Sequence, residues 1–202
     1  MAKRKDFRIL AKINHIPSEE AELIYLEPGN RVGPNNRYEI IHLIGTGSIG
    51  AVYLVKDYEE KESLFALKMI LPDVLQNEKE LDIFIDYISQ VQELKHPNLL
   101  QIHDFWKQNT LYFYTMEYVD GHSLRDMMDE QRERKEIIPL KEACEMAIKM
   151  CNAIEFVHFT GHYRLHPENV LLAGDFKKRS HIVKLCDFGM YPLKPSSFWK
   201  EA

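Results

Sequence analysis

The chain has little cysteine, no long apolar run and no excess of positive charge. None of its apolar runs approaches the roughly 18 consecutive residues that a membrane-spanning helix needs. The formal net charge of -5 gives no electrostatic basis for binding nucleic acid or an anionic membrane. The first ten residues, MAKRKDFRIL, are basic but lack the apolar stretch of a secretory signal. We therefore expect a cytoplasmic protein with neither a nucleic-acid nor a membrane partner.

The three cysteines are too few for a disulfide framework, and they show no paired CxxC spacing. They are Cys144, Cys151 and Cys186. This usage fits a reducing compartment. Cys144 and Cys151 lie two helical turns apart, and we expect both to be small buried residues on the core face of a helix.

What is present is the composition of a globular protein, with 45% hydrophobic and 28% charged residues among 202. That length can hold one large domain or two small lobes around a cleft. Residues 1–36 are broken by PSEEAE and PGNRVGPNN, which predicts an N-terminal arm with turns.

From residue 37 onward the sequence consists of short apolar segments joined by polar connections. RYEIIHLIG, AVYLVKD and SLFALKMI follow one another closely, which predicts three strands of an antiparallel meander, and QIHDFWK and TLYFYTMEY add two more. Asn77, with Glu80 three residues later, predicts the start of a helix, which ends before His96-Pro97. Residues 37–119 therefore predict five strands and one helix.

The remaining residues, 120–202, read as mainly helical. Ser123 and Asp126 predict the cap of a short helix, and Pro139 begins a longer amphipathic helix that ends at Gly161. The apolar positions of this second helix are Ala143, Met146, Ala147, Met150, Ile154 and Val157. VLLAG and HIVKLCD predict a final hairpin. The fold class is therefore α+β.

A glycine-rich string connects the first two predicted strands: Gly45, Gly47 and Gly50 fit the pattern G-x-G-x-x-G. This pattern also occurs in dinucleotide-binding folds, but there the glycines open a helix, whereas here an apolar strand follows. Glycine lets the backbone approach phosphate oxygens because no Cβ stands in the way. A simple hairpin turn would not require three glycines at this spacing.

Lys68 lies inside the apolar third strand, in FALK. A buried lysine is costly unless its charge is used. It could be an edge lysine that reaches water, but its place after the glycine loop favours an anionic phosphate as its partner.

With these residues in place, the chain resembles the eukaryotic-type protein kinases, including their bacterial Ser/Thr members. The glycine loop matches the family's G-x-G-x-x-G-x-V and FALK matches V-A-I-K. HPNLL, LYFYTMEYVDGHSL, PENVLL and the DFG at 187–189 match later motifs in the same order. The resemblance implies a protein-kinase-like N-lobe at 37–119 and a partial C-lobe at 120–202.

The resemblance also implies a site for ATP and Mg²⁺. The glycine loop would cover the phosphates, Lys68 would hold the α- and β-phosphates, and Asn169 and Asp187 would ligate Mg²⁺. The adenine would lie between apolar side chains and hydrogen-bond to the backbone after the gatekeeper. These residues would be Ile44, Val52, Ala66, the gatekeeper Met116, and the backbone of Glu117 and Val119.

The catalytic loop departs from the family. The pattern H-R-D-L-x-x-x-N places an aspartate five residues before the asparagine, and Arg164 occupies that position here. His166 stands where the family has a lysine. Residues 161–167 contain no acid under any gap placement. A general base contributes typically about 10²- to 10⁴-fold to the rate, and arginine cannot accept a proton near neutral pH.

The first helix departs as well. The family's glutamate, which pairs with the strand lysine, is replaced by Tyr87. Asp86 lies about 100° away on an ideal helix, and Glu80 lies two turns earlier. Lys68 is therefore expected to lack its usual ion pair or to pair with Asp187 instead.

After DFG the sequence runs MYPLKPSSFWKEA, without the family's A-P-E segment and later helices. We expect an incomplete C-lobe whose apolar helix face is covered by a protein partner. The first hypothesis is a pseudokinase, a nucleotide-responsive module with impaired or absent phosphotransfer. The alternatives are a weakly active Ser/Thr kinase and a truncated or split kinase fragment that needs a partner chain.

Overall fold

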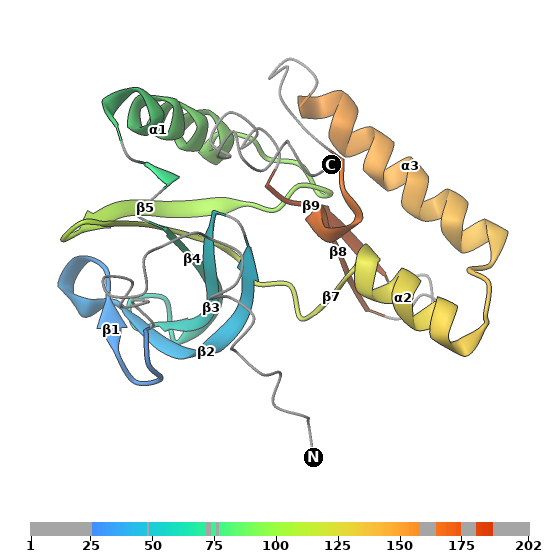
Figure 1. Ribbon diagram of the computed structural model, residues 1–202, viewed down its shortest axis with the longest axis horizontal. Helices are drawn as coiled ribbons and strands as arrows, with labels where there is room; N and C mark the ends of the chain where they lie inside the picture. Colours follow the sequence, from blue (N-terminus) through green and yellow to red (C-terminus); the bar gives the residue numbers. More distant parts are fainter. Residues whose placement is uncertain are drawn as a thin grey trace, which may run out of the picture.

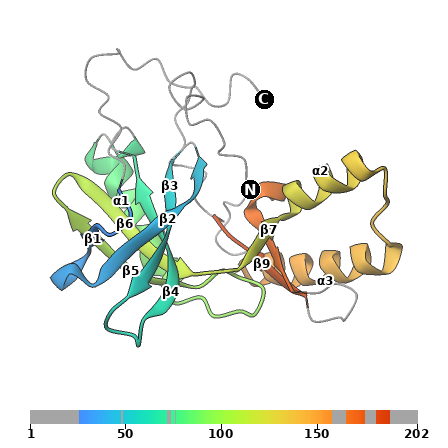
Figure 2. The same ribbon diagram turned by 90° about the horizontal axis from the view of Figure 1, so that it is seen from below.

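The computed structural model describes residues 26–47, 49–71, 74–75, 77–157, 165–174 and 181–187. Figure 1 shows a sheet with one helix on one side of the molecule, and two helices with a small sheet on the other. The turned view in Figure 2 shows that the connection from β6 to β7 joins these two parts. The kinase-like α+β arrangement expected from the sequence is present.

The first part is a six-stranded antiparallel sheet in the order β1-β2-β3-β4-β6-β5. Its strands are β1 (Arg31–Val32), β2 (Tyr38–Gly47), β3 (Gly50–Asp57), β4 (Ser63–Ile70), β5 (Ile102–Gln108) and β6 (Leu111–Glu117). All five predicted strands are present. The sixth, β1, pairs with the start of β2, so the sheet begins inside the segment that the sequence presented as an arm.

Both faces of this sheet contribute to a hydrophobic core, and alternate residues of a strand point to opposite faces. One face carries Tyr53, Val55 and Leu67 into a core of its own. The other carries Ala66, Tyr114 and Met116 into a larger core that continues into the second part of the molecule. Lys68 belongs to this second face, since it pairs with Tyr114 across the strands.

Helix α1 (Glu78–Gln92) lies against the second face. The Asn77 side chain accepts a hydrogen bond from the Glu80 amide at 3.0 Å, as the sequence predicted for its N-terminus. Phe84 packs edge-on against Phe105, with ring centroids 5.5 Å apart. Tyr87 is on the buried side of the helix.

The second part consists of β7 (Gly121–Ser123), α2 (Leu124–Arg134), α3 (Leu140–Val157), a 3-10 turn (Pro167–Asn169), β8 (Val170–Ala173) and β9 (Ile182–Leu185). The predicted capping box of α2 is formed by Ser123 and Asp126. Strands β7, β8 and β9 make a three-stranded antiparallel sheet, which includes the predicted hairpin. The predicted end of α3 at Gly161 lies outside the described residues.

The expectation that Cys144 and Cys151 are buried was wrong, because both are exposed. Helix α3 buries a different face, centred on Met146, Ala153 and Val157. The apolar spacing expected from the sequence includes Met146 and Val157 and so identified this buried face, whereas the two cysteines lie on an exposed one. Within the described part of the chain, no helix is long and apolar enough to cross a membrane.

Candidate nucleotide site

The centre of the candidate site is an ion pair between strand β4 and the residue that follows β9. Lys68 Nζ lies 2.5 Å from Asp187 Oδ2. The Lys68 side chain is only 5% exposed and that of Asp187 29%. This is the alternative partner that the sequence allowed for Lys68 once the helix glutamate was found to be missing.

Two buried tyrosines flank this pair. Tyr114 on β6 donates a long hydrogen bond of 3.4 Å to Asp187 Oδ1, and its ring lies 5.9 Å from Lys68 Nζ. Tyr87 occupies the expected helix position. Burial raises the pKa of both phenols well above 10, and the charge of Asp187 raises it further. Both tyrosines are therefore neutral at physiological pH and cannot replace a carboxylate.

Asn169 lies next to Asp187 through the backbone. The Asn169 carbonyl accepts a hydrogen bond from the Cys186 amide at 2.9 Å. Asp187 itself has a φ of 52°, a left-handed conformation that costs a non-glycine residue about 1 to 2 kcal/mol. The amide oxygen of Asn169 and the carboxylate of Asp187 are hard oxygen donors of the kind that suits Mg²⁺, so the residues fit the expected cation.

The thiol of Cys186, next to Asp187, is not a reactive group in this setting. Burial raises its pKa above the ordinary value, and the charge of Asp187 adds to the effect. Its Sγ points to the Asn169 carbonyl at 3.4 Å.

Most of the expected adenine-binding side chains come together beside this pair. Ala66 is opposite Met116 in the β4–β6 register, and Val52 is opposite Lys68 in the β3–β4 register. Val52 and Val119 pack against the apolar cluster that contains Ala66 and Met116. Ile44 is 40% exposed at the irregular end of β2 and is not part of that cluster.

Glu117 is held in place after the gatekeeper. Its amide donates to the Gln101 carbonyl at 2.9 Å, and its carboxylate pairs with Lys184 Nζ at 2.7 Å. Because Lys184 is on β9, this ion pair joins the large sheet to the small one.

The glycine loop forms a narrow hairpin rather than the start of a helix. Gly45 is opposite Val52 and Gly47 is opposite Gly50 in the β2–β3 register. A Cβ on Gly45 or Gly47 would meet nothing within 4 Å, so their backbone is open to an approaching group. A Cβ on Gly50 would lie 2.1 Å from the Met69 carbonyl oxygen, so this glycine is required by the sheet itself.

Parts of the expected catalytic loop lie outside the described residues, and Arg164 is among them. So are Ser48 of the glycine loop and Phe188 and Gly189 of the DFG. His166 is described: it is half-buried, and its Nδ1 lies 3.6 Å from Glu168 Oε2.

The sequence did not single out Tyr114 and Lys184, which hold Asp187 and Glu117. The position of Tyr114 could have been predicted, because it lies two residues before Met116 and therefore on the same face of a strand that pairs with the strand of Lys68. Nothing near Lys184 distinguished it from an ordinary surface lysine.

Comparison with known proteins agrees with this geometry. The sequence model of the protein kinase domain family matches residues 38–196 of this chain. The chain is 29% identical over 183 residues to the serine/threonine-protein kinase D1044.8 of Caenorhabditis elegans, covering 85% of this chain and 18% of that protein. It is 30% identical over 145 residues to the serine/threonine-protein kinase PknD of Chlamydia trachomatis, covering 67% of this chain and 15% of that protein.

Among solved structures, the kinase domain of Mycobacterium tuberculosis PknI superposes with a TM-score of 0.71 at 24% identity. The alignment covers 82% of this chain and 64% of that domain. This likeness shows the fold. The matched part of this chain spans only 15–22% of the length of its curated serine/threonine kinase relatives.

Proposed function

Since the chain belongs to the protein kinase domain family, we propose that it binds ATP with Mg²⁺ and has impaired or absent phosphotransfer, as a pseudokinase that acts as a nucleotide-responsive module. The observation that carries this proposal is the convergence of Lys68, Asn169 and Asp187 beside the apolar residues expected to hold adenine.

Each described element supplies one part of the proposed nucleotide site. The open backbone of Gly45 and Gly47 faces the phosphates, and Lys68 supplies the charge for them. Val52, Ala66 and Met116 supply an apolar surface for the base. A Mg²⁺ ion held by Asn169 and Asp187 would neutralise phosphate charge.

The loss of phosphotransfer rests on the sequence. Arg164 stands where the family has its aspartate, and arginine cannot accept the proton of a substrate hydroxyl. Tyr87 in the helix position adds support, because it is neutral and leaves Lys68 paired with Asp187.

A thermal-shift titration with ATP, with and without Mg²⁺, tests the binding. A ligand that binds only the folded state must raise its stability, so we expect the Tm to rise with Mg-ATP and the rise to be lost in Lys68→Ala. Absence of any shift at millimolar ATP would refute the proposal.

A weakly active Ser/Thr kinase is the competing function, and the relatives named as serine/threonine kinases favour it. Here His166, beside Glu168, would have to assist the transfer, or the substrate would attack without a base. Transfer of labelled γ-phosphate to a generic acceptor, abolished by Lys68→Ala, would establish this function instead. A chain that binds Mg-ATP without transfer supports the pseudokinase.

We further propose a protein partner for the outer face of α3. Leu140 and Ile148 are 80% and 59% exposed there, which is unusual for large apolar side chains on one helix. A purified chain that is monodisperse without any partner would argue against it.

A further inference from the structure

Lys68 and Asp187 form an ion pair, and α1 offers no acid that could replace Asp187 as the partner of Lys68. Among the residues that the structure describes, Asp187 is the one carboxylate that pairs with Lys68. Asp86 is exposed, Glu80 is half-buried in the first turn of α1, and the inward position is Tyr87. The same Asp187 is the residue proposed to hold the cation.

We propose that the empty site is closed to a divalent cation and opens only when a nucleotide phosphate takes Lys68 away from Asp187, with Tyr87 as the residue that imposes this order. The inference rests on the proposed nucleotide site and adds to it a rule for how the two ligands enter.

A cation without a nucleotide has to compete with Lys68 for Asp187. Asp187 can turn towards a cation only by leaving Lys68, a residue that is only 4% exposed. A buried charge that loses its partner is strongly destabilising. Both carboxylate oxygens are also engaged by donors, Oδ2 by Lys68 and Oδ1 by Tyr114. The empty site therefore presents two hydrogen-bond donors where a cation would have to bind.

Once an anionic phosphate lies beside Lys68, the ammonium has a new counter-ion and Asp187 is released. The released carboxylate then lies close to the phosphate, and this repulsion is removed by a cation between them. The ion pair between Lys68 and Asp187 is thus replaced by two others, one between Lys68 and the phosphate and one between Asp187 and the cation.

Tyr87 cannot replace Asp187 as the partner of Lys68. Its hydroxyl is neutral, so it cannot hold the Lys68 charge when Asp187 leaves. A glutamate at this position would give Lys68 a second carboxylate and would leave Asp187 free in the empty site. Tyr87 is therefore a positioning residue, which acts on the cation through Lys68 and Asp187.

Direct titration of the chain with Mn²⁺, in the absence of nucleotide, tests the closure. We expect Tyr87→Glu to bind Mn²⁺ at least about tenfold more tightly than the wild type does. Gln90→Glu is the matched control, because it adds the same charge on the exposed side of α1 and should bind as the wild type does. Equal Mn²⁺ affinity in the wild type and Tyr87→Glu would overturn the inference.

Asp187→Asn provides a second test, and the single variant can be measured whether or not Tyr87→Glu folds. This variant should have a lower Tm than the wild type in the absence of ligand, because Lys68 loses its counter-ion. It should also bind metal-free ATP more tightly than the wild type does. Adding Tyr87→Glu to Asp187→Asn should restore part of the Tm, whereas adding Gln90→Glu should not. An unchanged Tm in Asp187→Asn would show that the pair does not hold the empty site.

The two proposals fail in different ways. If Mg-ATP raises the Tm but Mn²⁺ binds the empty wild type readily, the order of entry is wrong and the nucleotide site stands. If Mn²⁺ is excluded as expected but ATP never raises the Tm, the nucleotide site is wrong, and the opening step is wrong with it.

Discussion

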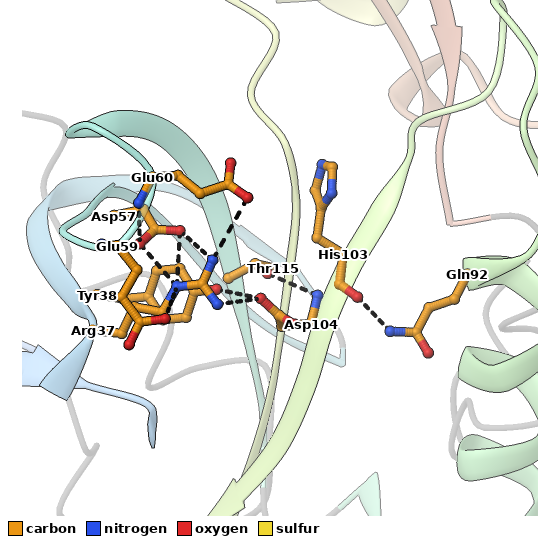
Figure 3. Close-up of polar contacts among 9 residues, drawn as sticks. All are labelled: Arg37, Tyr38, Asp57, Glu59, Glu60, Gln92, His103, Asp104 and Thr115. Carbon is orange, nitrogen blue, oxygen red and sulfur yellow. Dashed lines mark hydrogen bonds and ion pairs between the residues drawn. The ribbon is translucent and has the colours of Figure 1, made fainter. Parts of the chain in front are cut away.

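Arg37 donates two hydrogen bonds to the buried carboxylate of Asp57, one from Nη2 at 2.6 Å and one from Nε at 2.9 Å. The Asp57 side chain is fully buried and that of Arg37 is 18% exposed. Figure 3 shows the guanidinium between Asp57 and Asp104, with Glu59 and Glu60 nearby. The network joins the start of β2, the end of β3 and strand β5.

We expect Asp57→Ala to lower the free energy of unfolding by about 3 kcal/mol, because it breaks a buried bidentate pair and leaves Arg37 without its closest partner. Urea denaturation measures the loss. Glu39→Ala is the control, since Glu39 forms an exposed pair with Arg31 and should cost about 1 kcal/mol or less. Equal losses in both variants would contradict the assigned importance of Asp57.

The same carboxylate predicts a pH dependence. Burial alone would raise the pKa of Asp57, but hydrogen bonds from Arg37 and from the Glu59 and Glu60 amides outweigh it, so the pKa lies below its ordinary value. A lowered pKa adds stability that is fully present above the unfolded value of about 3.9 and is lost as the pH falls through the folded value. Below about pH 4, Asp57→Asn should lose less stability per pH unit than the wild type. Parallel denaturation curves would contradict this.

The sequence predicted local features of the fold well, because each had its own signal. SLFALKMI coincides with β4, and the caps at Asn77 and Ser123 form the expected hydrogen bonds. The two-residue strand β1 was missed, since two residues carry no periodicity. The apolar spacing of α3 identified the buried Met146 and Val157, but Cys144 was wrongly expected to be buried, because only packing decides which apolar residues of a helix are covered.

The site was predictable wherever a motif supplied the residue, and not where a contact did. Lys68 and Asp187 came from motifs, and their pairing followed from the missing acid at Tyr87. Tyr114 and Lys184 act through partners 73 and 67 residues away along the chain. Such contacts depend on how the two sheets come together, which no local pattern encodes.

The ion pair between Lys184 and Glu117 predicts a small, salt-sensitive contribution to stability. The two side chains are 14% and 33% exposed, so Lys184→Met should cost about 1 kcal/mol or less. The loss should shrink at about 1 M salt, where screening acts over about 3 Å. Lys56→Met is the control, because its pair with Glu62 is more exposed and should contribute less. A larger loss in the control would contradict the prediction.

The capping box of α2 predicts a clear cost for Ser123→Ala. The Ser123 hydroxyl accepts from the Asp126 amide at 3.1 Å, and the Asp126 carboxylate accepts from the Ser123 amide at 3.0 Å. Loss of such a cap costs about 1 kcal/mol, measurable by urea denaturation. Ser89→Ala removes a hydroxyl on the exposed side of α1 and should change stability by less than about 0.5 kcal/mol. Equal effects would show that the cap is not needed.

Two glycines of the loop, Gly50 and Gly47, should affect stability and nucleotide binding separately. Gly50→Ala should lower the free energy of unfolding by about 2 kcal/mol or more, because its Cβ would lie 2.1 Å from the Met69 carbonyl oxygen, and backbone cannot move aside cheaply. Gly47→Ala meets no atom within 4 Å, so its stability should equal that of the wild type or exceed it slightly.

Gly47→Ala should nevertheless weaken the Tm rise with Mg-ATP, because a Cβ there obstructs the approach of the backbone to a phosphate. Urea denaturation without ligand and thermal shift with Mg-ATP, applied to both variants, measure the two effects separately. A Gly47→Ala chain that binds Mg-ATP as the wild type does would remove the loop from the nucleotide site. A Gly50→Ala chain of wild-type stability would instead show that β3 and β4 do not approach as closely as the structure has them.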